Sequence, residues 1–69
     1  MSQLSAKERE ILNWISKGKT TGEIAEIMDL SASTIAFHYQ SVVRRYGTTT
    51  RAQTVVEAIR RGDIQLEGH

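Results

Sequence analysis

The chain has 69 residues, of which 39% are hydrophobic, and a formal net charge of +1. A chain of this length forms one small domain with one core, so an active-site cleft within that core is not expected. The sequence has no cysteine, and its two histidines, His38 and His69, lie far apart in the chain, so no disulfide, metal site or other cofactor site is predicted.

Two amphipathic segments in the first half of the chain predict helices over about residues 6–17 and 21–28. Ser5 and Glu8 have the spacing of a capping box, in which each side chain bonds the backbone amide of the other residue. The segment from Thr20 to Glu23 repeats this arrangement before the second helix. The residues expected to face the core are Ile11, Leu12, Ile15, Ile24, Ala25, Ile27 and Met28.

The third predicted helix spans about residues 32–46 and follows a cap at Ser31. No acidic residue occurs between Asp29 and Glu57. A helix face without carboxylates can lie against a polyanion without repulsion, so nucleic acid is the first partner to consider. The expected inward residues are Ile35, Tyr39, Val42 and Tyr46, and the opposite face has Ser33, Ala36, Phe37, Gln40, Ser41, Arg44 and Arg45.

A fourth helix is predicted over about residues 51–61, where Thr50 and Gln53 make a further capping box. Few apolar residues follow it, so we expect the domain to comprise residues 1–64 and residues 65–69 to form a disordered tail. The fold class is therefore all-α, with four helices joined by tight turns. The fourth helix is expected to turn inward Ala52, Val55, Val56 and Ile59.

The second and third predicted helices are separated by about three residues. This is the arrangement of a helix-turn-helix, which lays its second helix in the major groove of DNA. An enzyme is not expected, because no serine or threonine has a base partner at helical spacing. The main alternative is a protein-interaction module that presents the apolar residues of the fourth helix. No apolar run approaches the roughly 20 residues that span a bilayer and no signal peptide is visible, so a cytoplasmic location is expected.

Four separated blocks of the sequence form a consistent pattern: Leu4-Ser5-x-x-Glu8-x-Glu10-Ile11-Leu12-x-Trp14, Gly18-Lys19-Thr20-x-x-Glu23-Ile24-Ala25, Leu30-Ser31-x-x-Thr34-Ile35-x-Phe37-His38 and Arg51-x-Gln53-x-Val55. Together they resemble the LuxR-type helix-turn-helix domain, also called the GerE or NarL/FixJ family. The resemblance extends from Leu4 to about Ile64. It implies a four-helix fold and DNA binding.

Within that family, Trp14, the Gly18-Lys19-Thr20 block and the Phe37-His38 pair look more like quorum-sensing regulators that bind acyl-homoserine lactones than like phosphorylated response regulators. A response regulator and a stand-alone small regulator are the alternatives. Two positions depart from the family pattern. Thr48 stands where the family usually has an apolar residue, and Tyr46 stands where leucine is commoner. Both departures suggest an altered contact between the third and fourth helices.

The resemblance implies that Ala36, Phe37 and Gln40 face the bases. Gln40 can pair with adenine N6 and N7, and Ala36 or Phe37 can touch a thymine methyl group. The alternatives are packing against neighbouring helices for Phe37 and a solvated surface for Gln40. Basic and hydroxyl residues are the expected phosphate contacts, one or two of them being only solvated. These residues are Lys19, Thr20, Thr21, Ser33, Thr34, Arg44, Arg45 and Arg51.

Two more aromatic side chains have structural interpretations. His38 lies beside the inward face of the third helix, so we expect a partly buried structural residue, with a phosphate contact as the alternative. Trp14 is expected to pack at the core or its boundary, with its indole N–H bonded locally.

The predicted function is sequence-specific binding of double-stranded promoter DNA, as the output domain of a bacterial transcriptional regulator. The resemblance implies dimerisation through the fourth helix, at Val56, Ile59 and Arg60, to read a pseudo-palindromic site. The dimer is expected to be weak, because most of that helix must pack in the core. A small-molecule inducer would act only through a sensor domain absent from this sequence. RNA polymerase is a further candidate partner, a membrane is not, and the bacterial nucleoid is the expected location.

Overall fold

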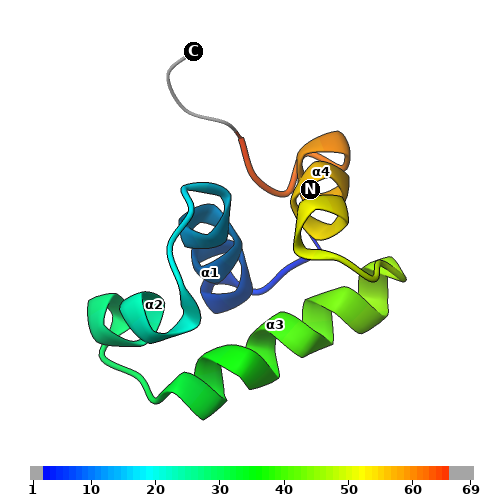
Figure 1. Ribbon diagram of the computed structural model, residues 1–69. Helices are drawn as coiled ribbons and strands as arrows, with labels where there is room; N and C mark the ends of the chain where they lie inside the picture. The colour runs from blue at the N-terminus through cyan, green and yellow to red at the C-terminus, as the bar shows by residue number, and fades with distance from the viewer. Residues whose placement is uncertain (1–2, 66–69) are drawn as a thin grey trace.

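Helix α3, Ala32–Tyr46, is the longest of the helices and runs along one side of the molecule (Figure 1). The structure is a computed structural model that describes residues 3–65. Over this range there is no strand, and the other helices are α1 (Ala6–Ser16), α2 (Thr21–Met28) and α4 (Arg51–Arg60). The all-α prediction is confirmed. Helices α1 and α4 each end one residue earlier than predicted, because Lys17 and Arg61 are caps.

Each helix begins at a predicted cap. Ser5 Oγ accepts a hydrogen bond from Glu8 N over 3.1 Å, and Ser5 N donates to Glu8 Oε1 over 3.0 Å. The same reciprocal pair begins α2 and α4, whereas α3 begins at a single capping hydroxyl. Since one cap stabilises a helix by about 1 kcal/mol, local side-chain chemistry determines where these helices start. The capping residues are Ser5, Thr20, Ser31 and Thr50.

The turn between α2 and α3 depends on a left-handed residue that is not glycine. Asp29 has a φ of 56°, and the next amide, Leu30 N, donates to Ala25 O over 2.9 Å. Aspartate adopts this conformation more readily than most side chains. The chain therefore reverses within three residues and brings the start of α3 beside α2.

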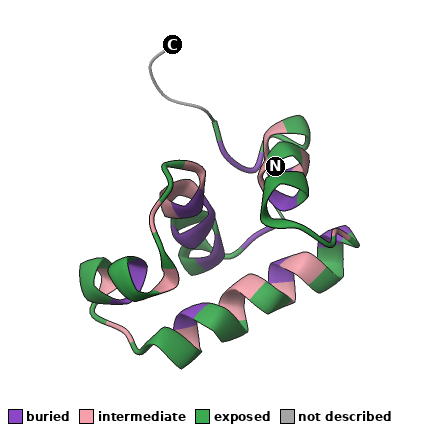
Figure 2. Ribbon diagram, in the orientation of Figure 1, coloured by how far each residue is buried: buried purple, intermediate pink, exposed green. Residues whose placement is uncertain are grey.

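Helix α1 lies at the centre of the packing. It contacts α2, α3 and α4, whereas α2 and α4 do not contact each other in residues 3–65. Figure 2 shows the buried residues on the sides that the helices turn toward one another. Helix α3 is thus held from one side, which leaves its outer face to solvent. The core consists of Leu4, Ile11, Leu12, Ile15, Ile24, Ala25, Ile35, Val42, Tyr46, Ala58 and Ile64.

The inward face of α4 overlaps the predicted one only in part. Thr54 and Ala58 are fully buried, whereas Val56 is 61% exposed and Ala52 is also exposed. The prediction was wrong at Val56 and Ala52, because it counted only hydrophobic side chains and a bonded threonine can also be buried. The other two predicted residues of this helix are partly buried. On α2, Ile27 was also expected to face inward, but it is 45% exposed, because the inward face of this helix is formed by Ile24, Ala25 and Met28.

A chain of hydroxyl groups joins α3 to α4 through Thr54. Its Oγ1 donates to Thr50 O over 2.9 Å and lies 2.7 Å from Thr48 Oγ1. Tyr39 OH donates to the same oxygen over 3.4 Å. These bonds satisfy a buried hydroxyl that would otherwise destabilise the core. This bond explains why a threonine, and not an apolar residue, stands at position 48: its hydroxyl pairs with the buried hydroxyl of Thr54.

The turn after α4 packs against the end of α3. Tyr46 OH donates to Asp63 Oδ2 over 2.5 Å, and Asp63 and Ile64 are each 4% exposed. Burial raises the pKa of Tyr46, and the hydrogen bond to the Asp63 carboxylate raises it further, so the phenol stays a donor. The unusual tyrosine at position 46 thus fastens the C-terminal turn. Residues 66–69, most of the predicted tail, lie outside the described residues.

Candidate nucleic-acid interface

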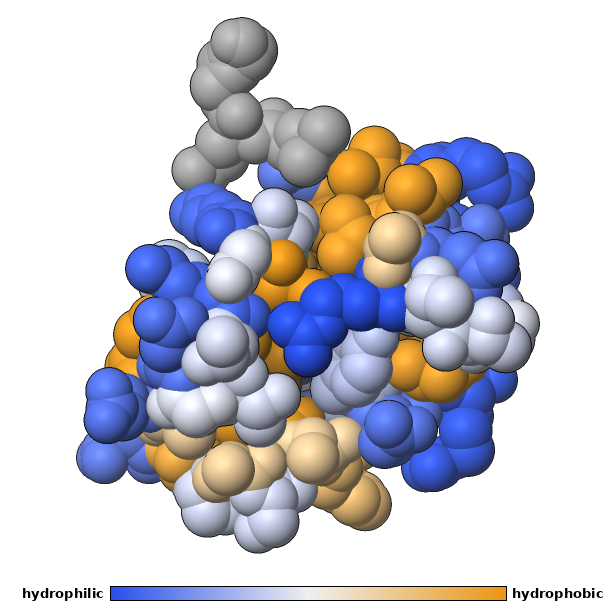
Figure 3. Space-filling view, viewed as in Figure 1, coloured by the Kyte–Doolittle hydropathy of each residue, from blue (hydrophilic) through white to orange (hydrophobic). Residues whose placement is uncertain are grey.

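The outer face of α3 is exposed along its whole length. Ala36, Phe37 and Gln40, the predicted base contacts, are all exposed, and Phe37 is 65% exposed. Phe37 is therefore not a core residue, which removes the packing alternative. Figure 3 shows mostly pale colours along the lower edge of the molecule, where the first half of α3 lies, so this surface is neither strongly charged nor strongly hydrophobic. Such a face can approach base edges without burying an unpaired charge.

Hydroxyl groups gather at the N-terminus of α3. Ser31 Oγ accepts from Thr34 N over 3.1 Å and lies 2.8 Å from Thr34 Oγ1 and 3.2 Å from Ser33 Oγ. This end of a helix also has free backbone amides and a partial positive charge, which favour phosphate. The structure brings the hydroxyl groups of Ser33 and Thr34, two of the predicted phosphate contacts, together with that of the capping residue Ser31.

An arginine at the start of α4 bonds the loop that precedes α2. Arg51 Nη1 donates to Lys19 O over 3.4 Å, although the two residues are far apart in sequence. Lys19 is half-buried, and Thr20 and Arg51 are exposed. Thr20 already accepts from Glu23 N over 3.1 Å, and the Glu23 carboxylate accepts from Thr20 N over 2.8 Å. The hydrogen bond from the Thr20 amide lowers the pKa of Glu23, which places one negative charge beside these candidate phosphate contacts.

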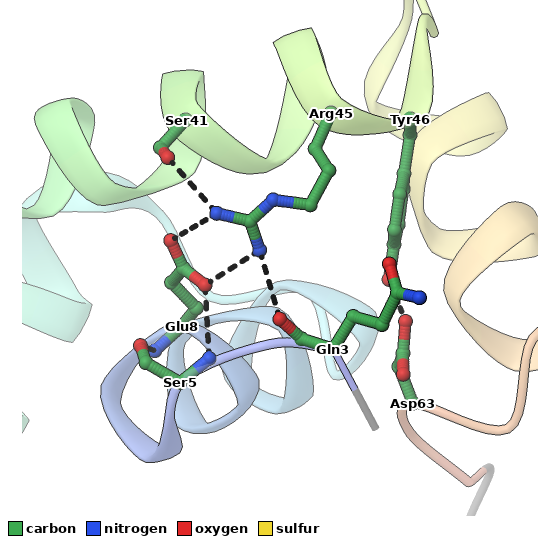
Figure 4. Close-up of polar contacts among 7 residues, drawn as sticks. All are labelled: Gln3, Ser5, Glu8, Ser41, Arg45, Tyr46 and Asp63. Atoms are coloured by element: carbon green, nitrogen blue, oxygen red, sulfur yellow. Dashed lines mark hydrogen bonds and ion pairs between the residues drawn. The ribbon is translucent and has the colours of Figure 1, made fainter. Parts of the chain in front are cut away.

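The two adjacent arginines of α3 have different surroundings. Arg44 is exposed, whereas the Arg45 guanidinium turns back toward α1 (Figure 4). Arg45 Nη1 donates to Glu8 Oε1 over 3.1 Å and to the Gln3 carbonyl over 3.1 Å, and Nη2 donates to Glu8 Oε2 over 3.4 Å. Ser41 Oγ accepts a further bond from Nη2 at 3.4 Å. The geometry therefore gives Arg45 a role within the fold and leaves Arg44 directed to solvent.

Glu8 takes part in both a helix cap and this ion pair. The Glu8 side chain is 8% exposed, against 36% for the Arg45 side chain. Burial alone would raise the pKa of Glu8, but hydrogen bonds from the Ser5 amide and the Arg45 guanidinium hold it below the ordinary value of 4.5. Glu8 is thus ionised in the folded domain at neutral pH. Sequence reasoning assigned Glu8 to capping only, because nothing local links it to Arg45.

Acid is expected to destabilise the domain. The folded-state pKa is lowered for Glu8, and to about 2 for Glu57, which accepts hydrogen bonds from Arg60 and Arg61. A carboxyl with a lowered folded-state pKa contributes stability above its unfolded value, near 4.5, and that stability is lost as the pH falls toward the folded value. Melting followed by circular dichroism should give the same temperature at pH 7 and 6 and a temperature lower by several degrees at pH 3. An equal melting temperature at pH 7 and pH 3 would contradict these ionised pairs.

His38 and Trp14 lie at the boundary of the core. His38 is half-buried, and its ring meets the Phe37 ring edge to face, with centroids 5.5 Å apart and planes at 71°. Trp14 packs against the core, and its Nε1 donates to Glu10 Oε2 over 3.4 Å. Lys17 Nζ lies 4.9 Å from the centre of the Trp14 ring. The predicted boundary position of Trp14 and its local indole bond are confirmed.

The predicted dimer residues lie on or near a hydrophobic surface of α4. Figure 3 shows hydrophobic side chains gathered over this helix. Val56 is 61% exposed and Ile59 is half-buried, while Arg60 Nη2 donates to Glu57 Oε2 over 2.8 Å. An open groove of about 500 Å³ runs beside them and is lined by Tyr46, Gly47, Thr48, Ala52, Gln53, Val56 and Glu57.

The described part of the chain has neither a membrane-spanning helix nor a metal-binding cluster. None of its helices has both the length and the apolar character required to span a bilayer. Residues 3–65 also contain no group of three or more histidine, cysteine, aspartate or glutamate side chains placed to bind a metal ion.

The chain is similar to known regulators over most of its length. A family model described as bacterial regulatory proteins, luxR family, matches residues 2–58. The transcriptional activator protein SolR of Ralstonia nicotianae is 43% identical over 61 residues, covering 88% of this chain and 26% of that protein. The HTH-type quorum-sensing regulator RhlR of Pseudomonas aeruginosa is 38% identical over 61 residues, covering 88% of this chain and 25% of that protein. The chain thus spans about a quarter of the length of these relatives.

A solved structure has the same fold. The structure of the transcription factor GerE matches with a TM-score of 0.91 at 27% sequence identity, covering 97% of this chain and 100% of that one. The order and packing of all the helices described above are therefore shared with a transcription factor.

Proposed function

Because the chain belongs to the luxR family of bacterial regulatory proteins, we propose that it reads promoter DNA as the output domain of a quorum-sensing regulator. As a member of that family the chain is the DNA-binding helix-turn-helix domain of a transcriptional regulator, and it is not an enzyme. The observation that carries the proposal is the outer face of α3, which is exposed, has no carboxylate and has hydroxyl groups at one end and Arg44 at the other.

In the proposed complex, α3 enters the major groove. Gln40 and Ala36 then face base edges, and Phe37 lies beside them. Arg44 and Arg51 bind phosphates on either side, helped by Lys19 and by the hydroxyl and amide groups where α2 and α3 begin. Of the predicted phosphate contacts, Arg45 acts instead through α1, because its guanidinium bonds Glu8.

In the proposed regulator, the inducing signal is sensed by a part of the full protein other than this DNA-binding domain. Support for quorum sensing comes from RhlR, which is itself described as a quorum-sensing regulator. We propose that the full protein carries a sensor for an acyl-homoserine lactone, works in the bacterial cytoplasm at the nucleoid, and contacts RNA polymerase. Two copies would pair weakly through α4, where Val56 is exposed, Ile59 is half-buried and Arg60 lies at the edge. This pairing allows two half-sites to be read.

Binding-site selection from a random pool of duplex DNA tests the DNA-reading part of the proposal. The 69-residue chain should enrich a defined sequence at low salt, and titration with that duplex should shift amide resonances between residues 31 and 51. An unbiased pool after several rounds, with no resonance shifts in α3, would overturn the proposal. Full-length protein should bind the selected site more tightly with an acyl-homoserine lactone than without it, and an equal affinity would remove the quorum-sensing part.

A further inference from the structure

The buried polar residues that the structure describes outside α3 share one property: each bonds a side chain of α3. They are Glu8, Thr54 and Asp63. A buried polar group is tolerated where it is hydrogen-bonded, but an apolar pair can fill the same space without that requirement. Burial alone therefore does not account for these bonds. The pairs are Glu8 with Arg45, Thr54 with Tyr39 and Asp63 with Tyr46.

The three partners on α3 reach three separate parts of the scaffold. Tyr39 and Tyr46 are seven residues apart, which is about two turns, so they lie on the same side of the helix. Figure 4 shows Arg45 and Tyr46 extending from the end of α3 toward α1 and toward Asp63. The bonds thus tie α3 to α1, to α4 and to the turn that follows α4.

These bonds constrain α3 in a way that its apolar contacts do not. Ile35 and Val42 are 1% and 0% exposed, and their burial favours one face of the helix without a preferred direction. A hydrogen bond, in contrast, weakens steeply when its donor angle or its length departs from the optimum. Bonds that reach three parts of the scaffold therefore resist both rotation of α3 about its axis and sliding along it.

The outer face of α3 is where this alignment has its effect. Side chains that bond a ligand must be held within about 0.5 Å and 10–20° of the productive geometry. The proposed base contacts between Ala36 and Gln40 lie on the same helix as the three bonds, so a rotation of α3 moves them relative to the base edges. Phosphate contacts tolerate such a movement better, because they act mainly through charge.

We propose that Tyr46 and Asp63 are positioning residues for DNA recognition, and that their hydrogen bond, with those at Thr54 and Glu8, sets the rotation of α3 in the major groove. This inference rests on the proposed function. All four residues are buried, so they act through α3 and not by contact with DNA. Loss of one bond should lower discrimination between DNA sequences more than affinity for DNA in general.

Tyr46→Phe tests the inference, because it removes only the hydroxyl that bonds Asp63. The affinities of the duplex enriched by binding-site selection and of an unrelated duplex of equal length are measured by fluorescence anisotropy. One salt concentration is used, at a temperature where circular dichroism shows every variant folded. The ratio of the two affinities should fall about threefold or more, because contacts to base edges depend on alignment. Affinity for the unrelated duplex should stay within about twofold.

Two further variants separate positioning from stability. Combining Tyr46→Phe with Asp63→Leu replaces both partners by apolar side chains, so it should regain melting temperature relative to Tyr46→Phe while the ratio stays low. Ile15→Val shortens a buried side chain of α1 that takes no part in these bonds. It should lower the melting temperature by several degrees and keep the full ratio.

The outcomes distinguish this inference from the proposed function. The inference fails if Tyr46→Phe keeps the full ratio, if Ile15→Val lowers the ratio as much, or if the double variant regains the ratio together with its melting temperature. In each of these cases the sequence-selective binding of the unsubstituted chain stands. An unsubstituted chain without any sequence preference would instead overturn the proposed function.

Discussion

Replacing Arg45 with methionine is expected to lower the free energy of unfolding by about 2 kcal/mol, a large share of the stability of a small domain. The Arg45 guanidinium bonds both oxygens of the Glu8 carboxylate, at 3.1 and 3.4 Å, and Glu8 is buried. Removing it leaves a buried negative charge without its cationic partner. The partial exposure of Arg45 keeps the effect below the roughly 3–5 kcal/mol of a fully buried pair. Unfolding in urea measures the change.

A second variant shows whether the effect comes from the ion pair. Glu8→Gln removes the negative charge but keeps a side chain able to complete the capping box. In that background Arg45→Met should destabilise the domain much less than it does alone, giving a clear coupling energy. Arg44→Met provides the matched control, since Arg44 is exposed on the same turn, and it should change stability by less than about 0.5 kcal/mol. Equal effects of the two arginine substitutions would contradict the anchoring role of Arg45.

Gln40→Ala is expected to remove most of the discrimination between the selected DNA site and a site changed at the contacted base. A bidentate pair between glutamine and adenine accounts for about 1–3 kcal/mol of discrimination, so the ratio of affinities should fall by a factor of roughly 5 to 160. Gln40 is exposed, and we therefore expect no loss of stability. Competition binding with the two duplexes at one salt concentration gives the ratio directly.

Arg44→Ala provides the contrast to this variant. An arginine that binds a phosphate contributes equally to all sequences, so its loss should weaken binding to both duplexes by the same factor. The slope of log affinity against log salt should also fall by about one unit, whereas Gln40→Ala should leave it unchanged. If both variants changed discrimination alike, our division of α3 into base and phosphate contacts would be wrong.

Local signals explain why the helices could be predicted from the sequence. A capping hydroxyl with an acceptor three residues later determines a helix start by itself, and the pairs at Ser5 and Thr50 both formed as expected. The outer face of α3 was predictable for a similar reason, because helical spacing assigns each residue to a side. None of these inferences required knowledge of a distant contact.

The parts that escaped prediction all depend on contacts across the fold. Arg45 and Glu8 are 37 residues apart, and no sequence pattern distinguishes Arg45 from the adjacent Arg44. Thr54 was overlooked because its burial depends on the hydroxyl of Tyr39, on another helix, and on that of Thr48 in the preceding turn. A count of hydrophobic residues therefore identified Val55 and Ile59 correctly but misassigned Ala52 and Val56 and overlooked Thr54.

The division of α3 into an inner and an outer face has a consequence for how such regulators diversify. Apart from Arg45, the exposed residues of α3 make no contact that stabilises the core. The residues that cap the helix, Ser31 and Gly47, are also separate from the proposed base contacts. Because Ala36, Phe37 and Gln40 are exposed, substitutions at these proposed base contacts are expected to leave the stability of the domain nearly unchanged. If these residues read the bases as we propose, a few substitutions on one helix are enough to change the DNA sequence that the domain prefers, without rebuilding its core.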